Sequence, residues 1–213
     1  MIKHIIWDWN GTLFNDVELS VSVMNSILSE RLLPTMSIDY YKSIFTFPVI
    51  DYYKKLNIDF VKEPFNEIGK LFIDRYEARK HEPKLHDGTE ELLIYLKNKG
   101  ISQSILSAYS QTTLEEIISY YKIDSYFNNI VGLNHIYADS KIENGKKLMK
   151  RLNHNKHEIL FIGDTVHDFE VAEEIGISSV LFSKGHQCLE ILKTTGTKII
   201  GDLNEIKIQL EKQ

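Results

Sequence analysis

The sequence has very little cysteine, no excess of basic residues and no long apolar run. Its single cysteine, Cys188, excludes an internal disulfide and suits a reducing compartment. Lysine and arginine total 25 against 30 aspartates and glutamates, and this net charge of -5 argues against a broad nucleic-acid surface. No apolar stretch reaches membrane-spanning length, and Asp8 interrupts the N-terminal stretch before it could act as a signal peptide. We therefore expect a cytoplasmic protein that binds neither nucleic acid nor membrane.

The order of strand and helix patterns predicts the fold class. The chain has 213 residues with 43% hydrophobic content, which is enough for one full core and a small accessory domain. Strand and helix patterns alternate, without repeats or low-complexity tracts, and this alternation predicts an α/β fold with a parallel sheet. After the first apolar strand, further strands are expected near residues 102–107, 129–132, 158–163, 178–182 and 197–200.

A block without strand patterns interrupts this alternation. Its first apolar residues recur every three to four positions, as on one face of a helix that Pro34 closes. These residues are Val17, Val21, Met24, Leu28 and Leu32. Further helices fit near residues 37–45, 49–56 and 64–80. We interpret residues 16–80 as an inserted, all-helical cap domain, and residues 1–15 with 81–213 as the α/β core domain.

The most informative stretch places Asp8 at the carboxyl end of the first apolar strand, directly before a polar turn that contains Gly11. In open α/β sheets, ligands bind outside the carboxyl ends of the strands, so a carboxylate at this position faces a crevice. Asp8 is therefore a candidate nucleophile. The plainer alternative is an aspartate that stabilises a turn, because Asn-Gly pairs also favour turns.

Three further motifs follow downstream in the chain. Ser107 ends the apolar strand at 102–107, and Lys141 stands just ahead of a predicted helix. Lys146 and Lys147 follow closely, so the lysine of this motif is not fixed by position alone.

The last motif is an apolar strand that ends at Gly163. Asp164 follows directly, and Asp168 comes one helical turn later. His167 lies inside the motif and is read as a surface histidine.

These motifs together resemble those of the haloacid dehalogenase (HAD) superfamily of phosphohydrolases, of the phosphoglycolate phosphatase type. The usual first motif is Asp-x-Asp-Gly-Thr, and the stretch from Asp8 to Thr12 matches it with Asn10 in place of the second aspartate. The usual fourth motif, Gly-Asp-x-x-x-Asp, matches Gly163 to Asp168 without a gap. The resemblance runs from Asp8 to Asp168 and implies a Rossmann-like (HAD-like) parallel sheet core, flanked by helices, with a helical cap.

The residues themselves point to metal-assisted phosphoryl transfer. An anionic nucleophile is repelled by phosphate oxygens, so cations must lie between them. Asp8 and Asp164, at the ends of strands that would be neighbours, offer hard oxygen ligands for Mg²⁺. The resemblance adds the backbone carbonyl of Asn10 as a third metal ligand. Asp168 would orient metal-bound water or Lys141, although charge compensation at a helix N-terminus is the alternative.

The expected phosphate site combines a positive charge with hydrogen-bond donors. Lys141 would neutralise Asp8 and the phosphate, and the Ser107 hydroxyl would bind a phosphate oxygen. The backbone amides of the turn after Asp8 would bind the other phosphate oxygens. The residue after Ser107 is assigned to the same phosphate site. These further positions are Trp9, Asn10, Gly11 and Ala108.

Asn10 governs the turnover that we expect. In phosphatases of this family the second aspartate protonates the leaving group and then activates water, and an amide does neither. The sequence predicts a Mg²⁺-dependent phosphatase that acts on a small phosphorylated metabolite through an aspartyl-phosphate on Asp8, as a monomer or weak homodimer. It also predicts that an Asn10→Asp substitution raises turnover.

Alternatives to an efficient phosphatase stay open. The protein is then a slow phosphatase or an enzyme for substrates with good leaving groups. It is otherwise a phosphoryl-ligand-binding or interaction protein with little turnover. A phosphonoacetaldehyde hydrolase-like enzyme is a further alternative, because Lys42, Lys54 and Lys55 lie near the expected cap loop. Exposed helix lysines are the plainer interpretation of all three.

Overall fold

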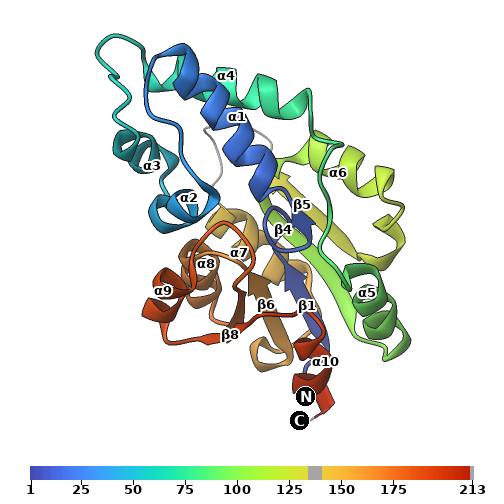
Figure 1. The fold of residues 1–213 in the computed structure, drawn as a ribbon. Coiled ribbons are helices and arrows are strands. Elements are labelled where there is room, and N and C mark those ends of the chain that lie inside the picture. Colours follow the sequence, from blue (N-terminus) through green and yellow to red (C-terminus); the bar gives the residue numbers. More distant parts are fainter. Residues whose placement is uncertain (134–140, 212–213) are drawn as a thin grey trace.

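The computed structural model describes residues 1–133 and 141–211. Its centre is a six-stranded sheet in the order β5-β4-β1-β6-β7-β8, in which every neighbouring pair is parallel (Figure 1). This arrangement confirms the predicted α/β fold. The strands are β1 His4–Trp7, β4 Ser102–Ser110, β5 Asn129–Leu133, β6 Ile159–Gly163, β7 Ser178–Phe182 and β8 Lys198–Ile200.

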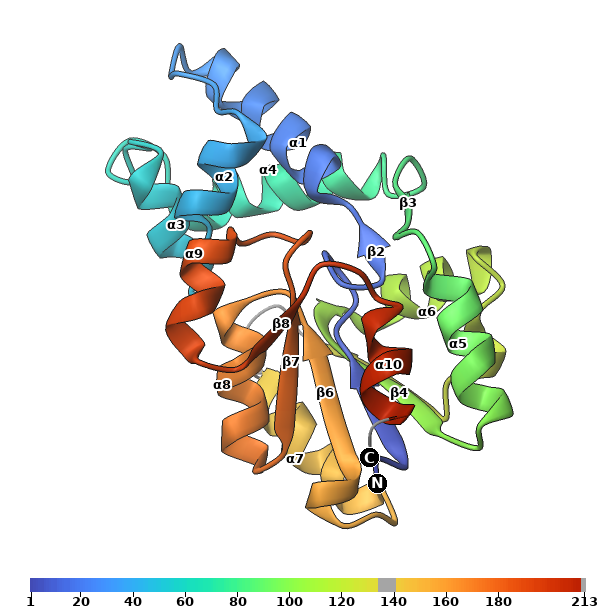
Figure 2. The same ribbon diagram turned by 60° about the horizontal axis from the view of Figure 1, so that its bottom comes forward.

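Helices cover both faces of this sheet because successive side chains of each strand point to opposite faces. Ile5 and Trp7 of β1 belong to one hydrophobic cluster, and Ile6 belongs to another. Helices α5 and α6 contribute to the first cluster and α7 and α8 to the second, on opposite sides of the sheet (Figure 2). The helices are α5 Thr89–Asn98, α6 Gln111–Tyr120, α7 Lys141–Arg151, α8 Val166–Ile175, α9 Leu189–Leu192 and α10 Glu205–Glu211.

Four further helices lie beyond the carboxyl ends of the strands (Figures 1 and 2). They bury a third hydrophobic cluster that is drawn mainly from their own residues. A two-stranded antiparallel ribbon joins the two chain segments that lead into and out of this layer. The helices are α1 Val17–Glu30, α2 Ile38–Ile44, α3 Val49–Lys55 and α4 Phe65–Glu77, and the ribbon strands are β2 Phe14–Asn15 and β3 Lys84–Leu85.

The end of α1 differs from the sequence-based prediction. Val17, Val21, Met24 and Leu28 are buried as expected, but Leu32 is 95% exposed. The helix ends at Glu30, and Leu32 adopts a left-handed φ of 54° just after it. The helical spacing therefore stops two residues before Leu32, and that side chain turns to solvent. Among the residues that the structure describes, no helix has the length and apolar character that crossing a bilayer would require.

His4 makes the stability of the sheet sensitive to acid. It is buried on β1, with Nδ1 2.6 Å from Ser102 Oγ on β4, and burial together with His154 lowers its pKa from 6.5 to about 4. The folded state thus favours the neutral imidazole, so this stabilisation is complete above pH 6.5 and is lost as the pH falls toward 4.

We expect His4 to account for about 3 kcal/mol of the loss in unfolding free energy between neutral pH and pH 4. Urea unfolding across this range, in the parent and in a His4→Gln variant, measures the contribution. The variant should show the shallower dependence on pH. Parallel curves for the two proteins would contradict the assignment.

Candidate active site

The structure brings four of the predicted residues together at the carboxyl edge of the sheet. Asp8 follows β1 and Asp164 follows β6, and these strands are neighbours. Asp168 lies in the first turn of α8, and Lys141 is the first residue of α7. All four are buried, and carboxylate oxygens of the three aspartates lie within 4.8 Å of one another.

Lys141 is the lysine that reaches the candidate nucleophile. Its Nζ donates to Asp8 Oδ1 and, over 2.6 Å, to Asp168 Oδ1. Burial opposes the charge on Lys141, but the two carboxylates outweigh this effect and raise its pKa above the ordinary value. Lys146 instead lies 3.4 Å from Glu143, and Lys147 lines a separate cavity. Of the three candidates, Lys141 therefore occupies the position beside Asp8.

Asp168 contacts both Lys141 and the start of α8. Its Oδ2 accepts hydrogen bonds from the backbone N–H of Asp164 (3.1 Å) and of Thr165 (2.9 Å), which caps the start of α8. Its Oδ1 accepts from Lys141. Although burial alone would raise the pKa of Asp168, Lys141 and the Thr165 contacts lower it below the usual range. The residue is thus a fixed anion that orients Lys141.

Thr12 and Gly11 hold the carboxylates of Asp8 and Asp164 close together. Thr12 Oγ1 lies 3.0 Å from Asp164 Oδ1 and 3.3 Å from Asp8 Oδ2. Gly11 has a φ of +76°, and a Cβ at this position would lie 2.3 Å from Asp164 Oδ2. Glycine is therefore required here both by backbone conformation and by the close approach of Asp164.

The charges of the site match a divalent cation. Burial raises the pKa of Asp8 well above its usual range, despite the neighbouring Lys141, and burial also raises the pKa of Asp164 to about 6. Within the described ranges, three of four buried aspartates contact a buried cationic side chain: Lys141 contacts Asp8 and Asp168, and the His186 ring contacts Asp16. The fourth, Asp164, accepts a hydrogen bond from the backbone N–H of His186. The hard oxygens and the surplus of negative charge suit Mg²⁺. The aspartates are Asp8, Asp16, Asp164 and Asp168.

The predicted phosphate-binding residues surround Asp8, but not all of their groups face a ligand. Ser107 is buried, and its Oγ accepts from Tyr109 N (3.0 Å), while Ala108 is exposed. Strand β4 runs on past Ser107 with a register shift, where the sequence suggested that it ended. Trp9 is fully buried and its indole stacks on Phe14, so this side chain does not face a ligand.

Gly11 N–H donates to Phe14 O (2.8 Å) and to Asp16 Oδ1 (2.9 Å), which keeps this amide inside the turn.

Sequence reasoning missed a second polar cluster, which joins the helical layer to the core. Asp16 Oδ2 accepts hydrogen bonds from Asn10 Nδ2 (3.0 Å) and from Tyr76 Oη (2.6 Å). Asp16 Oδ1 lies 3.2 Å from His186 Nε2, and His186 Nδ1 lies 2.8 Å from Tyr41 Oη. Burial would lower the pKa of His186, but Asp16 outweighs it and raises this pKa to about 9. His186 is therefore an imidazolium at neutral pH.

The end of α2 rests on the core loop that follows β7. Lys42 O accepts from Cys188 N (3.0 Å), and Phe45 O accepts from Gln187 Nε2 (3.0 Å). Just beyond, the Phe47 ring lies 4.8 Å from the ring of half-buried His167. The aromatic segment of the helical layer thus borders the motif that carries Asp164.

Lys42 differs in its surroundings from the other two helical-layer lysines. Lys42 Nζ donates to Lys184 O (3.1 Å), and burial lowers its pKa. Lys54 and Lys55 are exposed, the first paired with Asp51 at 2.7 Å. The exposure of Lys54 and Lys55 supports the plainer interpretation of exposed helix lysines, whereas Lys42 is half-buried against the core loop.

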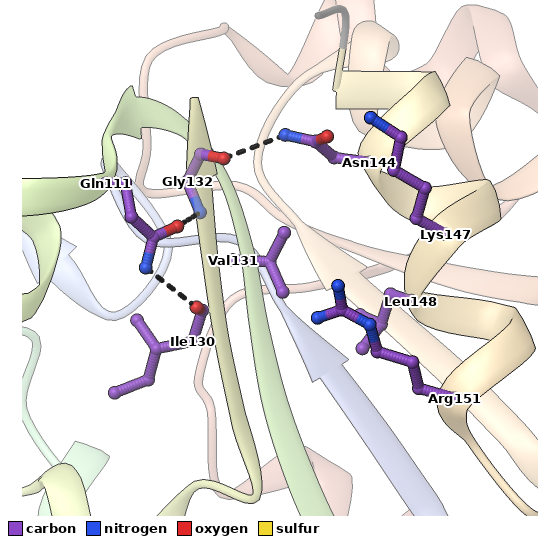
Figure 3. A pocket seen from close by; sticks show the side chains of 8 residues that line it. All are labelled: Gln111, Ile130, Val131, Gly132, Asn144, Lys147, Leu148 and Arg151. Carbon is purple, nitrogen blue, oxygen red and sulfur yellow. Dashed lines mark hydrogen bonds between the residues drawn. The ribbon is translucent and has the colours of Figure 1, made fainter. Parts of the chain in front are cut away.

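A cavity of about 330 Å³ lies between β5 and α7 (Figure 3). Gly132 of β5 is held from both sides: its N–H donates to Gln111 Oε1 (2.6 Å), and its carbonyl accepts from Asn144 Nδ2 (2.8 Å). Asn144 lies one turn after Lys141 on α7, so these bonds help to place Lys141. The lining residues are Gln111, Ile130, Val131, Gly132, Asn144, Lys147, Leu148 and Arg151.

The fold and the site define a class: an α/β protein with an aspartate–lysine cluster at the carboxyl edge of its parallel sheet. The chain belongs to the haloacid dehalogenase-like hydrolase family, whose model matches residues 5–182. This membership confirms the hydrolase class that the motifs predicted.

Named relatives span nearly the whole chain. Pyrophosphatase PpaX of Bacillus cereus (strain Q1) is 25% identical over 201 residues, which cover 90% of this chain and 89% of that protein. A haloacid dehalogenase-like family hydrolase from Streptococcus pneumoniae is similar in structure, with a TM-score of 0.84, 19% identity and 98% of each chain covered. Protein tyrosine kinase A of Mycobacterium tuberculosis is also similar, with a TM-score of 0.83, 21% identity and 98% of each chain covered. Since a hydrolase and a protein named a kinase share this fold, the fold alone does not fix the reaction.

Proposed function

We propose that this protein is a Mg²⁺-dependent phosphatase that transfers a phosphoryl group from a small phosphorylated metabolite to Asp8 and then to water. The observation that carries the proposal is the placement of Asp8 at the end of β1, buried against Lys141 and close to Asp164. The name of the PpaX relatives adds phosphoric anhydrides to the substrates worth testing.

The proposed reaction has two phosphoryl-transfer steps, in which Asp8 acts as nucleophile and then as leaving group. A carboxylate oxygen of Asp8 forms a bond to phosphorus while the bond to the leaving oxygen breaks; water then attacks phosphorus, and the bond to Asp8 breaks. Lys141 offsets the negative charge on Asp8 and the phosphate, and Thr12 restrains the Asp8 carboxylate. When bound by Asp8, Asp164 and the carbonyl of Asn10, Mg²⁺ supplies further charge that reduces repulsion between nucleophile and phosphate.

We further propose that residues 16–80 form a cap domain that selects substrates. Helices α1–α4 bury their own hydrophobic cluster, and the β2–β3 ribbon lies where the chain leaves and re-enters the core. The aromatic segment that contains Phe45 and Phe47 borders the core loop at 184–188 and the motif that carries Asp164.

A second candidate is a protein that binds a phosphoryl ligand with little turnover. Asn10 favours it, because the amide is held by Asp16 and Tyr76 and has no proton to give to a leaving group.

One assay separates the two candidates. Hydrolysis is measured with and without Mg²⁺ on pyrophosphate, an acyl phosphate, an aryl phosphate and an alkyl phosphate. Metal-dependent turnover of any of them supports the phosphatase. Binding of phosphate in the presence of Mg²⁺, with no turnover on the whole panel, would support the binding protein instead.

The two aspartates of the fourth motif should differ in their effect on Mg²⁺. We expect Asp164→Ala to weaken Mg²⁺ binding by about 100-fold or more, because a direct ligand is lost, and Asp168→Ala by only about tenfold, because it acts through Lys141 and α8. Calorimetric titration of Mg²⁺ into variants with folded circular-dichroism spectra gives the order. Equal losses, or a larger loss for Asp168→Ala, would reject Asp164 as the direct ligand.

A further inference from the structure

A single buried carboxylate links three parts of the molecule around the candidate site. Asp16 is 2% exposed and stands immediately before α1. Its Oδ1 accepts from Gly11 N–H in the nucleophile turn and faces His186 of the core loop. Its Oδ2 accepts from Asn10 in the turn and from Tyr76 on α4. The nucleophile turn, the core loop and the helical layer therefore converge on one side chain.

Asn10 provides donors that a carboxylate could not provide. One contact of Nδ2 runs to Asp16 Oδ2 and the other to Tyr76 Oη, each over 3.0 Å. An aspartate at position 10 would lose both donors and would place a second negative charge within hydrogen-bonding distance of Asp16. The amide at position 10 is thus matched to the carboxylate at position 16.

Two chains of contacts lead from Asp16 to the reacting groups. In the first, Asp16 fixes Gly11, and the adjacent Thr12 contacts both Asp8 and Asp164. In the second, Asp16 and Tyr41 hold the His186 ring from either side, and the backbone N–H of His186 donates to Asp164 Oδ2 over 2.6 Å.

We propose that Asp16 is a positioning residue for the reaction at Asp8, and that Asn10 is an amide because it must pair with Asp16. Only the kinetic test of this proposal rests on the proposed phosphatase function. It reverses the expectation drawn from the sequence: a carboxyl group added at position 10 alone disturbs the site instead of restoring an acid. Exchanging the two side chains, so that the carboxylate is at position 10 and the amide at 16, keeps one donor–acceptor pair and one charge.

The test compares Asn10→Asp, Asp16→Asn, and the double variant that carries both substitutions. Asn66→Asp, an exposed change of the same chemistry on α4, is the matched control. Tyr76→Phe removes only the hydroxyl that contacts Asn10 and Asp16, and it remains informative if a charge-changing variant fails to fold.

The first measurement is hydrogen exchange of the metal-free proteins, on peptides from the nucleophile turn, from α4 and from the loop at 184–188. We expect faster exchange in both single variants and a return toward the parent in the exchanged double variant. Tyr76→Phe should give a smaller increase, confined to α4 and the nucleophile turn. Unchanged exchange in both single variants, or no recovery in the double variant, would overturn the proposal.

The second measurement is kcat, KM and the Mg²⁺ concentration for half-maximal activity, on the best substrate of the panel. Each single variant should lose about tenfold in kcat, and the double variant should regain most of that loss. Half-maximal activity should need more Mg²⁺ in the single variants, which a mere loss of folded protein would not produce. Higher turnover of Asn10→Asp alone would overturn the proposal. If the parent hydrolyses no substrate, the proposed function fails, and the exchange experiment still decides the role of Asp16.

Discussion

Replacing Asp8 by asparagine should abolish phosphoryl transfer while the protein stays folded. The amide is nearly isosteric with the carboxylate, Thr12 can still donate to its oxygen, and Lys141 keeps Asp168 as a partner. The nucleophile itself is lost, however, and we expect turnover to fall by a factor of about 10³ or more. Steady-state kinetics with Mg²⁺ on the substrate panel measures this loss, and thermal unfolding checks the fold.

A trapping experiment makes this prediction more specific. Beryllium fluoride with Mg²⁺, which mimics an aspartyl-phosphate, should bind the parent and not Asp8→Asn. Asp39→Asn, an exposed change of the same kind in the first turn of α2, should leave both turnover and trapping unaltered. Folded Asp8→Asn protein with the turnover of the parent would rule out Asp8 as the nucleophile.

Lys141→Met should lower both stability and activity. Lys141 is 4% exposed and lies between the carboxylates of Asp8 and Asp168, so its removal leaves buried negative charges without their counter-charge. Breaking a buried ion pair from one side costs about 3–5 kcal/mol, and we expect a loss of this size in the free energy of unfolding at pH 7. Turnover should also fall by at least about 100-fold, because the charge that offsets repulsion at Asp8 is gone.

Urea unfolding of the metal-free protein measures the stability term of this prediction. Lys146→Met is the matched control, because Lys146 lies on the same helix in an exposed pair with Glu143, and its loss should cost less than about 1 kcal/mol. The deficit of Lys141→Met should shrink in acid, where the stranded carboxylates bind protons. Equal stability of the two methionine variants would show that Lys141 is not the buried counter-charge.

The sequence predicted the parts of the site that depend on local pattern. Asp8 and Asp164 each follow an apolar strand, and in a parallel sheet the carboxyl ends of such strands meet at one edge. The sequence left the choice among three lysines open, and the structure places Lys141 beside Asp8. At 3.6 residues per turn, Lys146 and Lys147 lie about 140° and 240° around α7 from Lys141, so they face elsewhere.

The residues that sequence reasoning missed depend on how the helical layer meets the core. Asp16 and His186 are 170 positions apart, and neither lies in a pattern that predicts their contact. Tyr76 is one of several aromatic residues on the apolar side of its helix. Only the structure shows that its hydroxyl contacts Asn10 and Asp16. The β2–β3 ribbon was missed because strands of two residues show no alternation.

The position of β1 in the sheet governs the order in which the chain can assemble during synthesis. His4 is in register with Ser102 on one side and with Ile159 on the other, and both of these partners come much later in the chain. Until those segments leave the ribosome, β1 is an apolar segment whose two edges have no partner strand, and such segments are prone to aggregate. Helices α1–α4 emerge in between and carry a hydrophobic cluster largely of their own. The segment that ends in Asp8 is therefore translated well before the two strands that enclose it, and slow translation lengthens the interval in which its edges are open.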